Sequence, residues 1–171
     1  MEQIIYATEK DISRILELMN NAAGAETPAD WYVTDDEDFV RRHMGGVEGY
    51  TLKYIIDSEI AAFLIVRHPG EAEDNLGRYL QGNSQYPIDL SAVAHMESAA
   101  VHPAHRGKGL QSKLLQQAEE IERAKGTKFL MATVHPDNNY SLRNLEAAGY
   151  KCILETEKYG GLRRKVMCRK L

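Results

Sequence analysis

Residues 99–117 read Ala-Ala-Val-His-Pro-Ala-His-Arg-Gly-Lys-Gly-Leu-Gln-Ser-Lys-Leu-Leu-Gln-Gln and carry three structural signals in succession. The small and β-branched residues at Ser98–Val101 predict a buried strand. A short turn with Pro103 follows. From Leu110 onward, apolar residues recur at the spacing of one helix face. The stretch therefore predicts a strand, a loop and the first turns of a helix.

The loop between this strand and helix is basic and carries two glycines, in the order Arg106, Gly107, Lys108, Gly109. Glycines let the backbone approach a ligand closely, and the free N–H groups and dipole at a helix start favour an anion. Arg106 and Lys108 add positive charge. The loop fits a pyrophosphate, although it matches neither the P-loop pattern nor the complete dinucleotide pattern. The alternative interpretation is a helix that merely begins after a basic turn.

The rest of the chain alternates strand and helix signals. Thr8–Asp11 and Thr34–Glu37 have the form of capping boxes and predict two helix starts, while Asp57-Ser58 predicts a hairpin turn. Residues 68–89 form a long irregular segment. We expect strands at residues 3–7, 50–56, 60–66, 92–101, 128–134, 150–155 and 162–169, and later helices from residue 110 and over residues 138–148. This order predicts an α/β fold with a mixed sheet of about seven strands, and residues 1–171 as a single domain.

Bulk composition narrows the class of protein. The chain has 25 acidic and 21 basic residues and a net charge of −4, which argues against a dedicated nucleic-acid binder. It has no apolar run long enough to span a membrane and no signal-peptide pattern, so we expect a cytoplasmic protein. Cys152 and Cys168 lack metal-ligand spacing and, being symmetric about Gly160, are expected nearly opposite each other in the last hairpin. We expect free thiols in a reducing compartment.

Two stretches resemble the GNAT (Gcn5-related N-acetyltransferase) superfamily. Arg106 and Gly109 match its acyl-CoA loop pattern, [Q/R]-x-x-G-x-[G/A], and Gln111 departs from the last position. The later stretch that begins at Val134 resembles V-N-P-x-N-x-x-A-x-x-L-Y-x-x-x-G-F, with Asn138 and Ser141 at matching positions and Gly149-Tyr150 as the closing pair. The resemblance implies a mixed, mostly antiparallel seven-stranded sheet with about four helices, splayed between the fourth and fifth strands.

The resemblance also implies an activity. It predicts an N-acetyltransferase that moves an acetyl group from acetyl-CoA, as co-substrate and without a metal, to an amine of a small molecule or peptide by direct transfer in a ternary complex. The expected partners exclude nucleic acid and membrane, and the protein is expected as a monomer or homodimer. The alternative is a non-catalytic acyl-CoA-binding or sensing domain. The implied CoA-binding residues are Ala99, Ala100, Val101, Arg106, Gly107, Lys108, Gly109, Leu110, Gln111, Ser112, Asn138, Ser141 and Asn144.

The strand before the loop carries two candidate bases. An amine acceptor must lose a proton before it attacks, and many relatives place a catalytic Glu on this strand. Glu97 is the first candidate and His95 the second; the alternative for each is a structural polar group. Strand alternation predicts that both share one face with Val93, Ala99 and Val101. The resemblance implies the alternative, a bulge that splays this strand from the fifth and shifts the facing.

One family feature is missing. Relatives often carry, four residues before the closing Gly, a Tyr that protonates the leaving thiolate, and here Leu145 stands at that position. Tyr140 lies five residues earlier, about 140° around the helix, so it should not replace that Tyr. The aromatic side chains considered as walls of the acceptor site are Trp31, Tyr32, Tyr79, Tyr86 and Tyr159.

Overall fold

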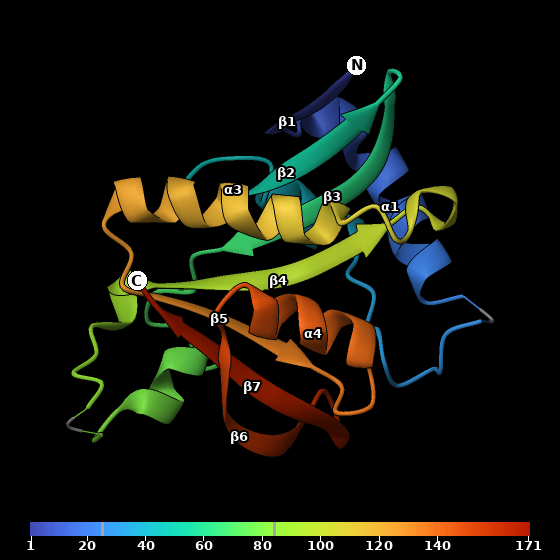
Figure 1. The fold of residues 1–171 in the computed structure, drawn as a ribbon. Coiled ribbons are helices and arrows are strands. Elements are labelled where there is room, and N and C mark those ends of the chain that lie inside the picture. The colour runs from blue at the N-terminus through green and yellow to red at the C-terminus, as the bar shows by residue number, and fades with distance from the viewer. Residues whose placement is uncertain (25, 84) are drawn as a thin grey trace.

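The structure is a computed structural model that describes residues 1–24, 26–83 and 85–171. Its described residues form one seven-stranded sheet in the order β1-β2-β3-β4-β5-β7-β6 (Figure 1). All neighbouring strands are antiparallel except β4 and β5, which are parallel. The strands are β1 (Glu2–Tyr6), β2 (Gly49–Ile56), β3 (Glu59–Arg67), β4 (Val93–Val101), β5 (Phe129–Val134), β6 (Lys151–Lys158) and β7 (Leu162–Lys170).

Helices cover both faces of the sheet (Figure 1). One face packs against α3 (Leu110–Lys125) and α4 (Asn139–Ala147) through the largest apolar cluster. The other face packs against α1 (Ile12–Ala22) and α2 (Glu37–Arg42) over strands β3 and β4. Short 3₁₀ turns within residues 68–92, chiefly Leu76–Leu80, cover β5 and β7 on that same face. The predicted strand and helix order, including four α-helices, is confirmed. None of the described helices has the length and apolar character that crossing a membrane requires.

The two predicted capping boxes had different outcomes. The first is present, because the Asp11 carboxylate accepts the Thr8 backbone N–H at 2.8 Å. The second was predicted at Thr34, but α2 begins at Glu37 and is capped by Asp36, whose carboxylate accepts the Phe39 N–H at 2.7 Å. A carboxylate two residues further on caps the helix in place of the hydroxyl.

The last hairpin places the two cysteines one register step apart. Cys168 pairs with Lys151, and Cys152 pairs with Met167, so the cysteines are nearly but not directly opposite each other, as predicted. Successive strand residues point to opposite faces. Cys168 is accordingly buried and Cys152 exposed, and both thiols are free, as predicted.

β4 parts from its neighbour halfway along its length. It pairs with β5 only at Val93, Ala94 and His95, and beyond this point the two strands separate (Figure 1). This confirms the predicted splay between the fourth and fifth strands.

A bulge changes the facing of β4 at the same place. On its other edge Met96 pairs with Val66 and Ser98 with Ile65, which leaves Glu97 as the extra residue. The extra residue reverses the alternation, so Ala99 packs beside Met96 on the α3 face. The expectation that Val93, His95, Glu97, Ala99 and Val101 share one face was therefore wrong beyond Glu97.

Candidate functional site

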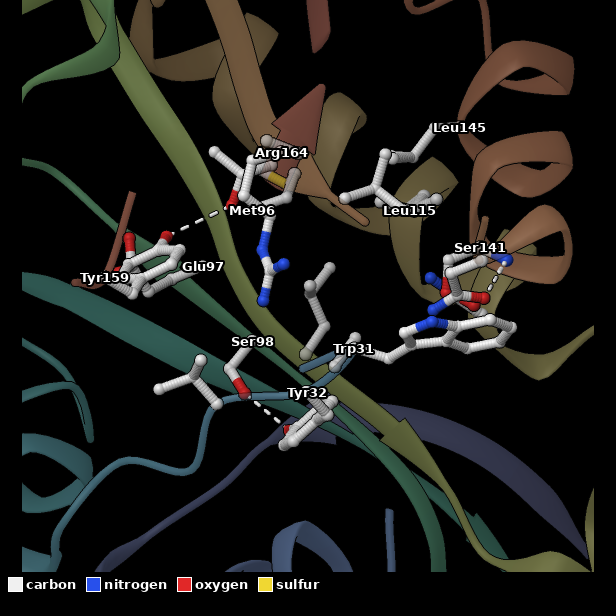
Figure 2. A pocket seen from close by; sticks show the side chains of 18 residues that line it. Trp31, Tyr32, Met96, Glu97, Ser98, Leu115, Ser141, Leu145, Tyr159 and Arg164 are labelled. Carbon is white, nitrogen blue, oxygen red and sulfur yellow. Dashed lines mark hydrogen bonds between the residues drawn. The ribbon is translucent and has the colours of Figure 1, made fainter. Parts of the chain in front are cut away.

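The gap between β4 and β5 opens into a pocket, which we call the central pocket (Figure 2). Its walls come from β4, β5, β7, both helices of the α3 face and the loop between α1 and α2. Beyond His95 and Met131, the facing edges of β4 and β5 have no ladder partner on each other. A ligand with amide groups can therefore bind to these edges. The residues that bear on the chemistry are Trp31, Tyr32, Glu97, Ser98, Gln111, Asn138, Ser141, Leu145, Tyr159 and Arg164.

A second hollow, the loop-side pocket, continues from the central pocket towards the glycine loop. The two pockets share Tyr32, Ala99, Gln111, Asn138 and Ser141 as wall residues, so they adjoin each other, and together we call them the channel. Seven of the predicted CoA-binding residues line the loop-side pocket, namely Ala99, Ala100, Val101, Arg106, Gln111, Asn138 and Ser141.

The glycine loop has the geometry that anion binding requires. Gly107 and Gly109 have φ values of +79° and +72°, which favour glycine strongly over other residues. Space is open at both positions, where a Cβ would meet no described atom within 4 Å. Gly109 is the N-cap of the 16-residue helix α3. The free N–H groups of its first turn and the helix dipole therefore face the loop.

Several other predicted CoA-binding residues, among them Leu110, Ser112 and Asn144, lie next to the loop-side pocket without lining it. The Leu110 side chain is buried in the core, so only its backbone is available to a ligand. Asn144 joins the two helices, because its Nδ2 donates to Gln111 Oε1 at 3.0 Å and its Oδ1 accepts from Ser112 Oγ at 3.1 Å. Exposed Lys108 contacts His105, with 3.1 Å between Nζ and Nδ1. The two Asn144 hydrogen bonds hold the first turn of α3 against α4.

Glu97 and His95 form a hydrogen-bonded pair at the bulge. The backbone N–H of Leu76 donates to His95 Nε2 at 3.0 Å, so this nitrogen carries no proton. The proton of the neutral ring is then on Nδ1, which donates to Glu97 Oε2 at 3.3 Å. His95 is 2% exposed, and both its nitrogens are engaged within the protein. Glu97, in contrast, is partly exposed and lines the central pocket.

Beyond Glu97 lies a third hollow, the far pocket, on the side away from the glycine loop. It shares Glu97, Thr133 and Tyr159 with the central pocket and adds Arg67 and Asp74, among others. The Arg67 guanidinium binds both Asp74 carboxylate oxygens, at 2.8 and 2.9 Å, and lies 3.9 Å from Glu97. The hydrogen bonds from Arg67 lower the pKa of Asp74. Of these two carboxylates, Asp74 is bound to Arg67 and, of the two pockets, lines only the far pocket, whereas Glu97 lines both.

Asp35 is a titratable group near the site that the sequence analysis missed. Burial raises the pKa of Asp35 to about 6, with a further contribution from the negative charges of Glu97 and Asp36, while Arg67 acts in the opposite direction. Asp35 lies inside the predicted capping box Thr34–Glu37, but no motif marks it as part of a site, because its burial and its proximity to Glu97 arise from the fold.

The raised pKa of Asp35 predicts a pH-dependent effect on stability. The folded chain binds a proton more tightly than the unfolded chain, so the ionised carboxylate destabilises the fold as pH rises from about 4 to 6. Asp35→Asn should therefore have little effect at pH 4 and, because solvent screens this partly exposed group, stabilise the protein by roughly 1–2 kcal/mol at pH 7. Urea unfolding of both proteins across this range measures the difference. An equal effect at both pH values would contradict the raised pKa.

Three of the five aromatic wall candidates line the central pocket, namely Trp31, Tyr32 and Tyr159. Tyr32 is tied to β4 by a 2.7 Å hydrogen bond between its hydroxyl and Ser98 Oγ, and the Tyr159 hydroxyl lies 3.1 Å from Thr133 Oγ (Figure 2). The other two candidates do not line the central pocket. Tyr79 contacts Lys158, and Tyr86 packs on Phe129.

The loop that carries Trp31 is fastened to the end of β5 by a histidine. The Trp31 ring stacks on the buried His135 ring, with 5.8 Å between centroids. The Asp137 N–H donates to His135 Nδ1, so Nε2 carries the proton and donates to Asp30 at 3.0 Å. The contacts of His135 with Trp31 and Asp30 therefore anchor the loop between α1 and α2 at the central pocket.

Leu145 and Tyr140 occupy the two positions that the sequence suggested. Leu145 is buried at 4% exposure and lines the central pocket. Tyr140 is 50% exposed and lines the loop-side pocket instead.

The described residues contain no group of three or more His, Cys, Asp or Glu side chains arranged to hold a metal ion.

The sequence model described as the acetyltransferase (GNAT) family matches residues 12–150. This match spans both the glycine loop and the Asn138–Tyr150 stretch, together with every strand from β2 to β5. The chain therefore belongs to the GNAT acetyltransferase family and is an acyltransferase of that type.

Solved structures share the fold. A putative acetyltransferase, yncA, of Salmonella typhimurium, with its cofactor acetyl-CoA, is 23% identical with a TM-score of 0.71, over 100% of this chain and 94% of its own. The ribosomal-protein-S18-alanine N-acetyltransferase of Escherichia coli is 16% identical with a TM-score of 0.72, over 99% and 94%. A GCN5-related N-acetyltransferase of Kribbella flavida is 19% identical with a TM-score of 0.74, over 99% and 98%. A comparison with curated proteins found no match.

Proposed function

We propose that residues 1–171 act as one domain that transfers an acetyl group from acetyl-CoA to an amine of a small molecule or peptide. Transfer is direct, within a ternary complex, and takes place in the cytoplasm. The observation that carries the proposal is the channel of adjoining pockets, which extends from Arg106 of the glycine loop to the gap between β4 and β5 and the Glu97 carboxylate. It offers an anion site at one end and a base at the other.

Acetyl-CoA fits the channel by the chemistry of its parts. The pyrophosphate binds the N–H groups at the start of α3, helped by Arg106 and Lys108. The pantetheine arm carries amides that suit the unpaired edges of β4 and β5. The thioester then lies in the central pocket, and the amine enters from the side of Glu97. Neither cysteine lines these pockets, so the route requires no cysteine-bound acyl intermediate.

The transfer needs one base, Glu97. The ammonium gives a proton to Glu97, directly or through water, and the amine nitrogen then attacks the thioester carbonyl carbon. The tetrahedral intermediate collapses as the C–S bond breaks, the nitrogen passes its second proton through water to the leaving thiolate, and Glu97 returns the first proton to solvent. His95 acts as a positioning residue, because its Nδ1–H holds one Glu97 oxygen and its Nε2 is occupied.

The leaving thiolate does not need a tyrosine acid from α4. A thiol has an ordinary pKa of about 8.5, so its thiolate leaves readily and solvent can supply the proton. We expect Tyr140→Phe to keep kcat within a few-fold of the wild type, because Tyr140 lies outside the central pocket. Leu145→Tyr is the complementary variant and should raise kcat if protonation limits turnover. A loss of ~10²-fold in Tyr140→Phe, the scale of a lost general acid, would contradict this assignment.

The proposal is tested by measuring CoA release from acetyl-CoA with panels of amines, amino acids, polyamines, aminoglycosides and peptides. We expect CoA release with the acceptors of one panel, and the N-acetylated product should be detected by mass spectrometry. Acetyl-CoA binding by calorimetry without release on any panel would instead favour a non-catalytic acyl-CoA-binding domain.

A further inference from the structure

Arg164 on β7 is a buried cation without a carboxylate partner among the described residues. Arg164 is only 3% exposed, and it lines the central pocket. Its Nη1 donates to the Arg163 carbonyl at 2.7 Å, and its guanidinium carbon lies 5.5 Å from the centre of the Tyr159 ring. Figure 2 shows the guanidinium projecting into the pocket between Tyr159 and Trp31.

These contacts leave most of the guanidinium unused. A guanidinium has five N–H donors, and the protein satisfies only part of one edge. Asp30 acts on it only from a distance, since the Asp30 carboxylate is bound to His135. A buried charge without a partner is costly, whereas an exposed arginine on this strand, such as Arg163 beside Glu155, has its own carboxylate at 2.9 Å. The remaining donors of Arg164 are therefore available to a ligand in the pocket.

The central pocket also holds a separate negative charge. Glu97 lines the same pocket but makes no ion pair with Arg164, and Tyr159 lies in the field of both. A pocket with one cation and one anion kept apart is complementary to a molecule that carries both charges. An ammonium suits Glu97, and a carboxylate suits the planar fork of an arginine.

We propose that Arg164 binds a carboxylate of the acceptor, so that the substrate is an amine with a nearby carboxylate, as in an amino acid. This inference rests on the proposed function and names the substrate class of the same site. The carboxylate binds the Nε and Nη2 side of the guanidinium, and the amine is thereby directed towards Glu97 and the thioester.

The test compares matched acceptors in wild type, Arg164→Met, Arg164→Lys and the control Arg163→Met. The acceptors are L-amino acids and aminoalkyl carboxylates, each paired with its carboxamide. We expect wild type and the control to prefer the carboxylate by ~10–10²-fold in kcat/KM, the range of a lost charge-assisted hydrogen bond. Arg164→Met should lose this preference by acting more slowly on carboxylates, and Arg164→Lys should keep part of it. Thermal unfolding checks that each variant folds.

The outcomes separate this inference from the proposed function. CoA release with equal rates on acids and amides, or a preference that survives Arg164→Met, would overturn the carboxylate site and leave the transferase intact. If no amine releases CoA, the proposed function fails. Binding then decides the inference: the same amino acids, titrated into the CoA complex, should stabilise wild type against heat but not Arg164→Met, and equal stabilisation of both would refute it.

Discussion

Gly109→Asp is expected to weaken acetyl-CoA binding by ~10²-fold or more while the fold persists. A Cβ at this position meets no described atom within 4 Å, so the substitution costs only the strain of a left-handed backbone with φ of +72°. Its carboxylate would stand at the start of α3, where the pyrophosphate binds in the proposed complex. Like charges placed against each other cost several kcal/mol, and every 1.4 kcal/mol is tenfold in affinity.

Two control variants isolate the charge at this position. Gly109→Asn has nearly the same shape without the charge, and Asn tolerates a left-handed backbone better than most residues, so it should bind acetyl-CoA much more tightly than Gly109→Asp. Gly126→Asp places the same residue at the other end of α3, where φ is +87° and space is also open. It should cost more stability than Gly109→Asp, because a carboxylate is unfavourable at a helix C-terminus, and should keep acetyl-CoA affinity. Calorimetry with undiminished affinity in Gly109→Asp would remove the anion site from the proposal.

Glu97→Gln is expected to lower kcat by ~10²–10⁴-fold with little change in acetyl-CoA affinity. The amide oxygen of Gln can still accept the hydrogen bond from His95 Nδ1–H, so the variant keeps the local geometry but has no carboxylate to take up the proton of the acceptor. Glu97 lines the central and far pockets but not the loop-side pocket, which explains why CoA affinity should be unchanged.

Asp35→Asn is the matched control for Glu97→Gln, because it neutralises the neighbouring carboxylate. If Glu97 is the base, the pH profile of kcat changes far more in Glu97→Gln than in Asp35→Asn. The opposite result would transfer the role to Asp35, whose pKa of about 6 also suits a base near neutral pH. Wild-type turnover of Glu97→Gln at every pH would show that Glu97 is not the base.

The order of elements and the glycine loop could be predicted from the sequence because each depends on neighbours along the chain. Apolar spacing marks a helix or strand within a few residues, and positive φ at Gly107 and Gly109 follows from the loop they form. The same local logic identified Asn138, which caps α4 by accepting the Ser141 N–H at 3.2 Å. The splay and the Glu97 candidate came from the family resemblance.

The facing of β4 depended on tertiary structure. The bulge at Glu97 is a mismatch between β3 and β4, so alternation within β4 alone predicts the wrong face for Ala99 and Val101. The pairing of Cys152 with Met167 is likewise set by the register between β6 and β7, and a single-residue step places the cysteines on opposite faces.

The charges of the pocket also came together only in the fold. Asp35, Glu97 and Arg164 come from a loop, β4 and β7, which lie far apart in the sequence. A sequence pattern indicates which residues are charged, but burial and the distance to other charges determine what each can bind or titrate, and both follow from packing between distant segments. The anion site proposed at the glycine loop was thus predictable from residues 99–117, whereas the arrangement of charges in the central pocket was set by the tertiary structure.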